Sequence, residues 1–192
     1  MSTVNALSKR KPVANLQKSE GFARMHGLNH VAYRCRDAEE TRHLYEDILK
    51  LPLSFVVFHD RVPSTGDYQP YYHIFFELAD GSHIAFFDLL DGKVTEPDPD
   101  TPTWLNHIAF DVETREDLLE AKATLEAAGV DVLGIVDHKI FDSIYFFDPN
   151  GIRLELVYRT APLALIKDEA AHAHKILAGR KKKIEALRRA AK

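Results

Sequence analysis

The six residues LNHVAY at positions 28–33 return almost unchanged as LNHIAF at positions 105–110. Their histidines, His30 and His107, lie 77 positions apart. Seven residues after each histidine stands a residue suited to cap a helix, Asp37 in the first half and Thr114 in the second. Self-similarity at a fixed interval indicates that one structural unit is built twice. We therefore expect each half to open with a strand and continue into a helix.

The expected helices have matching start and stop signals. Glu40 and Asp117 stand three residues beyond the two caps, where each can complete a capping box, glutamate better than aspartate. The first helix is expected to stop at Pro52 and the second at Gly129. Apolar residues at spacings of three and four give each helix one buried face: Leu44, Ile48 and Leu51 in the first, and Leu118, Ala121, Leu125 and Ala128 in the second.

Three β-like runs follow each helix, separated by aspartate, glycine and proline. They cover residues 53–59, 71–79 and 82–89 in the first half, and 130–136, 143–147 and 152–158 in the second. The predicted fold class is α+β: two tandem βαβββ modules that form one U-shaped mixed β-sheet around a cavity, plus a C-terminal helix. The predicted organisation is an N-terminal extension (1–26), a paired domain (27–159, with modules 27–90 and 104–159 and linker 91–103) and a C-terminal helical extension (160–192).

Composition narrows the class of protein. The formal net charge of −4 gives no bulk attraction to nucleic acid or to an anionic membrane. A single cysteine excludes an intrachain disulfide, and no long apolar run predicts a membrane span. We expect a cytoplasmic protein. The basic run at 180–183 is interpreted as a solvated helix end, with nucleic acid binding as the weaker alternative.

The repeated histidines have two interpretations. A histidine in an apolar strand is usually a hydrogen-bonded core residue, but that interpretation requires nothing of its neighbours. A metal site requires a carboxylate that faces the same cavity. Strand alternation points Glu155 away from Leu154 and Leu156, into the concave side of its module. Together with His30 and His107 it would complete the two-histidine, one-carboxylate set that binds non-haem Fe(II).

The LNH motifs and the run DPNGIRLELVY at 148–158 resemble the vicinal oxygen chelate superfamily. That superfamily includes glyoxalase I, fosfomycin-resistance enzymes, bleomycin-binding proteins and extradiol dioxygenases, and the resemblance covers about residues 27–159. It implies paired modules with metal ligands on the first and last strands. Transferred to this chain, the ligands are His30, His107 and Glu155.

A fourth protein ligand would favour glyoxalase I, whose first module supplies a carboxylate or its equivalent on its last strand. Aligning Gly81 with Gly151 places Ala85 opposite Glu155, and an alternative alignment places Phe87 there. Both residues are apolar. Asp88 has the opposite strand parity and is expected to face the helix side or solvent.

Three further residues match extradiol dioxygenases in the resemblance. His83 opens the last strand of the first module, where those enzymes carry an acid–base histidine. Tyr145 lies ten residues before Glu155, the spacing of their tyrosine, and His138 lies in the turn before it. A near-neutral histidine can move a proton, and a tyrosine hydroxyl can hydrogen-bond a bound substrate oxygen.

These features predict an extradiol ring-cleavage dioxygenase that acts on a catechol with Fe(II), or alternatively Mn(II), and O2. The metal ligands would be His30, His107 and Glu155, and the catalytic residues His83, Tyr145 and His138. The alternatives are a metal-dependent lyase or isomerase of the glyoxalase type, a thiol transferase, or a resistance protein that sequesters a small molecule. We expect a homo-oligomer whose partners are the catechol and O2, with no nucleic acid and no membrane.

Overall fold

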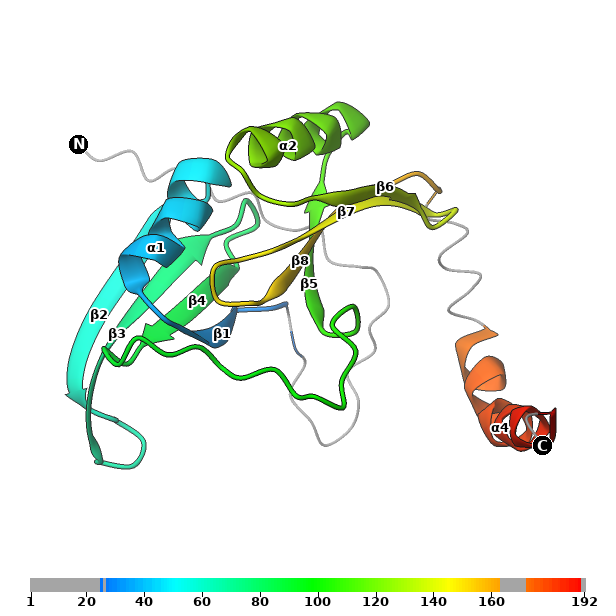
Figure 1. Ribbon diagram of the computed structural model, residues 1–192, viewed down its shortest axis with the longest axis horizontal. Helices are drawn as coiled ribbons and strands as arrows, with labels where there is room; N and C mark the ends of the chain where they lie inside the picture. The colour runs from blue at the N-terminus through cyan, green and yellow to red at the C-terminus, as the bar shows by residue number, and fades with distance from the viewer. Residues whose placement is uncertain (1–24, 26, 163–171, 191–192) are drawn as a thin grey trace.

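The computed structural model describes residue 25 and residues 27–162 and 172–190 (Figure 1). The expected N-terminal extension therefore lies almost entirely outside the described residues, and so does the first part of the C-terminal extension. The first module contains β1 (His30–Cys35), α1 (Ala38–Arg42), the π-helix η1 (His43–Ile48), β2 (Leu53–Arg61), β3 (Tyr68–Glu77) and β4 (His83–Asp88). The second contains β5 (His107–Val112), α2 (Arg115–Ala127), β6 (Leu133–Asp137), β7 (Phe141–Phe147) and β8 (Arg153–Arg159).

Each module forms its own four-stranded mixed sheet. The strand orders are β1-β4-β3-β2 in the first sheet and β5-β8-β7-β6 in the second, with β1 parallel to β4 and β5 parallel to β8. The other neighbours are antiparallel. α1 lies against the first sheet and α2 against the second (Figure 1). The expected α+β class and the two βαβββ modules are confirmed, with the sheet divided into one half per module.

Strand pairing shows that the sequence repeat is also a structural repeat. Ala32, two residues after His30, pairs with Ala85. The equivalent residue after His107 is Ala109, and it pairs with Glu155. Ala85 therefore occupies in the first module the place of Glu155 in the second, as the glycine-based alignment predicts.

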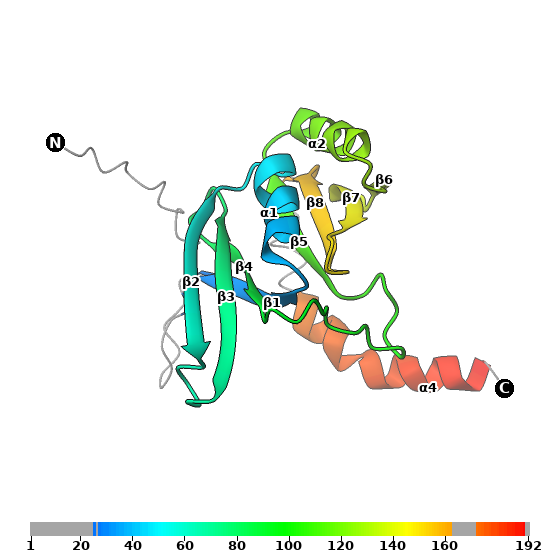
Figure 2. The same ribbon diagram turned by 60° about the vertical axis from the view of Figure 1, so that its left-hand side comes forward.

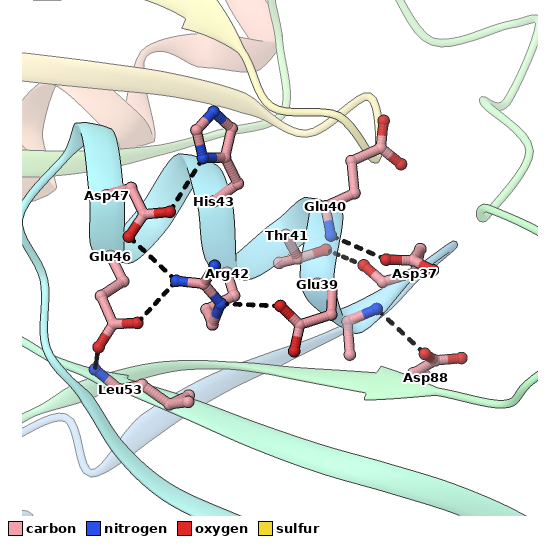
Figure 3. Close-up of polar contacts among 11 residues, drawn as sticks. Asp37, Glu39, Glu40, Thr41, Arg42, His43, Glu46, Asp47, Leu53 and Asp88 are labelled. Carbon is pink, nitrogen blue, oxygen red and sulfur yellow. Dashed lines mark hydrogen bonds and ion pairs between the residues drawn. The ribbon is translucent and has the colours of Figure 1, made fainter.

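The two helices begin where the sequence indicates, but their caps differ. Thr114 and Asp117 form a complete capping box at the start of α2. Asp37 accepts a hydrogen bond from the Glu40 backbone N–H at 2.8 Å (Figure 3). The Glu40 carboxylate turns to Arg36 instead. The box expected at Glu40 is therefore not closed, because a guanidinium four residues earlier is the stronger partner.

The first helix also ends differently from the expectation. α1 gives way to η1, which ends at Ile48 with Leu49 as its C-cap, before Pro52 is reached. Arg42 stands at this change, and its guanidinium contacts the carboxylates of Glu39, Glu46 and Asp47 (Figure 3). The strand limits differ from the expected ones by a few residues, most at β3 and β6.

A polar cluster joins the two modules. The buried Asn150, in the turn before β8, accepts from the Arg36 backbone N–H at 3.0 Å and donates to Thr41 Oγ1 at 3.2 Å. The Tyr45 hydroxyl donates to Asp148 Oδ2 at 3.1 Å. The buried apolar residues of both modules form one cluster around these contacts. The turn of the second module is thus fixed against the helix of the first.

Beyond the paired modules, residues 172–178 are helical, the chain turns at Gly179, and α4 (Arg180–Ala190) follows. The break expected at Gly179 is therefore present as a turn. Among the described residues, no helix is long and apolar enough to cross a membrane.

Candidate functional site

The centre of the site is formed by the first and last strands of the second module. His107 opens β5 and Glu155 lies in β8, which pairs with β5 in parallel. His107 Nε2 lies 2.9 Å from Glu155 Oε2. Glu155 is buried, as its position between Leu154 and Leu156 indicates. Strand alternation thus brings the carboxylate to the histidine.

A contact with the backbone indicates which ring nitrogen of His107 carries the proton. Its Nδ1 lies 3.0 Å from the carbonyl oxygen of Leu105. A carbonyl only accepts, so Nδ1 carries the proton, and in a neutral imidazole Nε2 then carries a lone pair. That lone pair faces a carboxylate oxygen, which is also an acceptor. A proton or a metal ion between the two atoms would relieve the conflict.

Tyr145 and His138 extend this pair into a chain of four side chains. The Tyr145 hydroxyl donates to Glu155 Oε1 at 2.7 Å and lies 2.8 Å from His138 Nε2. Because the hydroxyl proton is used on Glu155, His138 Nε2 is the donor to the tyrosine oxygen. Burial, followed by the hydrogen bond and the negative charge of Glu155, raises the pKa of Tyr145 above its usual value. The tyrosine is therefore neutral and holds its proton toward the carboxylate.

Arg153 is a residue of this site that the sequence analysis did not single out. Its guanidinium carbon lies 4.1 Å from the centre of the Tyr145 ring, and its Nη1 donates to the Trp104 backbone oxygen at 2.6 Å. Arg153 thus contacts both the tyrosine and the segment that enters β5. Arg153 lies two residues before Glu155 in the same strand, so strand alternation predicts that both side chains lie on the same face of the sheet.

His30 and His83 lie on the first sheet, away from this chain of four residues. They are register partners on β1 and β4, and both contact the ring of Phe75, at centroid distances of 5.5 and 6.0 Å. His30 Nδ1 is 2.6 Å from Asn29 Oδ1, an acceptor, so Nδ1 carries the proton and Nε2 the lone pair, as in neutral His107. Within the described part of the chain, no three His, Cys, Asp or Glu side chains are gathered to hold a metal ion. The single chain therefore brings His107 and Glu155 together and does not add His30 to them.

The first sheet presents a mainly aromatic face around these two histidines. His73 stacks on Phe87 at a centroid distance of 3.7 Å and contacts Phe75 at 4.1 Å. Burial, followed by the nearby His30 and His59, lowers the pKa of His73 to about 4. Its buried Nε2 has no hydrogen-bond partner among the described residues. The sequence around His73 carries no signal that would predict a neutral imidazole with one nitrogen lacking a hydrogen bond among the described residues.

Asp88 does not belong to this face. Its carboxylate accepts from the Ala38 backbone N–H at 3.0 Å (Figure 3). It also accepts from the Leu90 backbone N–H at 2.8 Å. It therefore lies at the start of α1, on the helix side of the sheet, as its parity indicates. With Ala85 in the place equivalent to Glu155, the first module has no carboxylate for a fourth ligand at that position.

The sequence of the paired modules matches a family model described as the Glyoxalase/Bleomycin resistance protein/Dioxygenase superfamily, over residues 27–156. The chain belongs to this superfamily. The matched range spans both modules from just before His30 to just after Glu155, so it contains every candidate site residue described above.

Solved structures share the fold of this superfamily member at low sequence identity. A glyoxalase/dioxygenase from Nostoc punctiforme is 21% identical, with a TM-score of 0.55 over 77% of this chain and 99% of that one. A glyoxylase/bleomycin resistance protein/dioxygenase domain from Frankia sp. EAN1pec is 20% identical, with a TM-score of 0.58 over 71% and 99%. The fosfomycin resistance protein FosX from Listeria monocytogenes, in complex with Mn(II) and sulfate, is 22% identical, with a TM-score of 0.52 over 71% and 95%.

The donor atoms of this superfamily member fit a divalent metal ion. Neighbouring ligands of an octahedral ion with bonds of about 2.1 Å lie roughly 3.0 Å apart. The separation of 2.9 Å between His107 Nε2 and Glu155 Oε2 matches that distance. The Leu105 carbonyl on the other nitrogen of His107 is the kind of outer contact that orients a metal-binding imidazole.

A cavity of about 1000 Å³ opens beside His107. It is lined by residues of the linker and of both modules, among them Tyr33, Leu105, Phe147 and Arg153. Its size suits a small organic molecule.

Proposed function

We propose that this protein is a metal-dependent extradiol dioxygenase, which cleaves the ring of a catechol beside its two hydroxyl groups. The observation that carries the proposal is the continuous contact from His107 through Glu155 and Tyr145 to His138. It joins two metal-ligand types to a tyrosine and a histidine suited to handle the protons of a bound catechol.

Fe(II) is the metal we propose, held by His107 and Glu155 with His30 as the third ligand. When bound, the ion would supply a common site for the two catechol oxygens and O2, and the redox chemistry between them. Two imidazoles and one carboxylate leave such a site net positive, so an anionic catecholate is favoured. The Mn(II) in the Listeria FosX structure makes Mn(II) the alternative metal to test.

The third ligand is supplied by a second copy of the chain in this proposal. His30 is exposed on the first sheet, whereas His107 and Glu155 meet on the second. In a two-fold dimer, the same pair of surfaces meets twice. Placing the first sheet of each copy opposite the second sheet of its partner would complete two identical sites. It would also bring His83 to the substrate.

The protein side chains then divide the proton handling. Tyr145 holds its hydroxyl beside the metal-binding carboxylate, where it can hydrogen-bond a substrate oxygen. His138 donates to the tyrosine oxygen and fixes the direction of that hydroxyl. His83, arriving from the first sheet, would accept a catechol proton and return it later. Phe75 and Phe87 would pack against the aromatic ring and exclude water.

The direct test is to load the protein with Fe(II) under anaerobic conditions, add a catechol and then admit air. Extradiol cleavage yields a yellow product, and oxygen uptake should match its formation one to one. Metal binding with no oxygen uptake for any catechol would overturn the proposal and favour the lyase or thiol-transferase class. Failure to bind any divalent metal would leave sequestration of a small molecule as the remaining class.

The shared site has its own test in mixed dimers. His30→Ala and His107→Ala should each be inactive alone, because each breaks both sites of its dimer. After subunit exchange, a mixed dimer regains one intact site, so an equal mixture should recover about a quarter of the wild-type activity. If the mixture stays inactive although exchange is verified by native mass spectrometry, the three ligands do not come from two copies.

A further inference from the structure

Charge is divided unevenly along the described chain. Residues 27–162 contain 25 acidic and 11 basic side chains, a net charge of −14. The C-terminal helical segment, residues 172–190, contains seven basic side chains and one acidic side chain, a net charge of +6. The near-neutral total therefore conceals an acidic pair of modules and a strongly basic helix.

The C-terminal helical segment also carries exposed apolar side chains. Ile184 and Leu187 lie three residues apart on one side of α4, and Leu177 precedes the turn at Gly179. Leu177 and Leu187 are 67% and 59% exposed, and no residue of α4 is buried. Figures 1 and 2 both show α4 beside the paired modules rather than packed among them. Among the residues that the structure describes, Leu177 and Leu187 are therefore left largely uncovered.

The acidic side chains of α1 and η1 are already paired with arginines of their own module. Arg42 contacts Glu39, Glu46 and Asp47 (Figure 3), and Arg36 contacts Glu40. Additional cations would gain little there, because each carboxylate has a guanidinium within contact distance.

The outer side of α2 differs in this respect. Glu113, Glu116 and Glu120 are exposed and form no ion pair with any residue that the structure describes. Leu119 lies among them and is 40% exposed. This outer face at the start of α2, formed by Glu113, Glu116, Leu119 and Glu120, therefore presents carboxylates without an ion pair among the described residues around an exposed leucine. It is the complement of a basic helix with exposed apolar side chains.

We propose that the C-terminal helical segment of one copy docks on the outer face of α2 of a second copy. Two C-terminal segments would repel each other side by side, because each carries +6. A nucleic acid or an anionic bilayer would attract the segment but would also meet the −14 of the paired modules behind it. α2 of the same chain lies across the molecule from α4 in both views (Figures 1 and 2), so the second copy supplies the partner surface.

Zero-length cross-linking tests the contact directly. A carbodiimide joins a lysine to a carboxylate only where they touch. Chains labelled with 15N are mixed with unlabelled chains until native mass spectrometry shows subunit exchange, and then cross-linked at low salt. We expect links from Lys181, Lys182 or Lys183 to Glu113, Glu116 or Glu120 between labelled and unlabelled chains. Links found only within one isotope would mean docking within one chain and would overturn the proposal.

Charge reversal provides the matched control. Lys181→Glu, Lys182→Glu and Lys183→Glu combined should abolish the links and weaken association of copies at low salt by roughly tenfold, the worth of a few exposed ion pairs. Adding Glu113→Lys, Glu116→Lys and Glu120→Lys should restore association. As a control, three charge reversals away from α2, at Asp60, Glu96 and Asp100, should not restore association. If both sets of reversals restore association, the effect depends on net charge alone and the docking proposal fails. If wild-type protein instead binds tightly to phosphatidylglycerol vesicles or duplex DNA and shows no links to α2, the partner of the helix is a polyanion and not a second copy.

Discussion

His107 Nε2 and Glu155 Oε2 lie 2.9 Å apart, although the Leu105 carbonyl holds the imidazole proton on the opposite nitrogen. Two acceptor atoms therefore face each other at hydrogen-bond distance in the neutral state of the histidine. Such a pair is poised for a cation, because a metal ion bound between the two atoms replaces the repulsion of lone pairs by two coordinate bonds.

This pair predicts that divalent metal stabilises the fold. A ligand present at 100 times its Kd stabilises the native state by about 2.7 kcal/mol, which raises the Tm of a chain of this size by roughly 5–10 °C. Thermal unfolding with and without Fe(II) or Mn(II) should show this rise in wild type and lose it in Glu155→Gln and His107→Ala. His43→Ala, on the exposed side of η1, should respond as wild type does. An undiminished rise in Glu155→Gln would remove the carboxylate from the site.

The proposed acid–base role of His83 predicts a defect in turnover and not in binding. His83→Gln should keep metal and catechol affinity and lower kcat roughly 10²–10⁴-fold, the usual worth of a positioned acid–base group. Tyr145→Phe should cost less, because it removes one hydroxyl and leaves the ring under Arg153. Steady-state kinetics together with anaerobic catechol binding separate the two effects. If His83→Gln turns over at the wild-type rate, His83 only lines the pocket.

The junction between modules predicts a graded loss of stability. Tyr45→Phe removes one hydrogen bond from Asp148, which keeps its contact with Asn150, and should cost about 1 kcal/mol. Asn150→Ala should cost about 2–3 kcal/mol, because it leaves the Arg36 backbone N–H without its acceptor and removes one of the two hydrogen bonds of Thr41 Oγ1. Urea unfolding measures both, with Asn106→Ala as the exposed control. Equal small losses would show that the junction is not cooperative.

Much of this site follows from local rules. The interval between the two LNH motifs predicts the repeated module, and two-residue strand alternation predicts that Glu155 faces His107. The same rule, applied through Gly81 and Gly151, identifies Ala85 as the equivalent of Glu155, which the strand register confirms.

The other features of the site depend on long-range packing, which the periodicity of the sequence does not encode. The sequence repeat treats His30 and His107 alike, but their separation on two sheets is set by how the modules join at Asn150 and Asp148. The change from α-helix to π-helix after Arg42 is likewise absent from the apolar pattern. The unpartnered nitrogen of His73 results from the aromatic rings that surround it, contributed by neighbouring strands.

His73 leads to the last prediction, which concerns stability and pH. Burial, then His30 and His59, lowers the pKa of His73 to about 4, from 6.5 in the unfolded chain. Between these two values the unfolded state binds more protons than the folded state, so stability falls as the pH falls through that window. His73→Phe keeps the stacking on Phe87 and removes the titration. Urea unfolding of metal-free protein at pH 7 and pH 5 should therefore show a smaller loss for His73→Phe than for wild type, whereas His174→Phe, on the exposed C-terminal segment, should match wild type. An unchanged pH dependence in His73→Phe would mean that His73 is solvated and free to protonate in the folded protein.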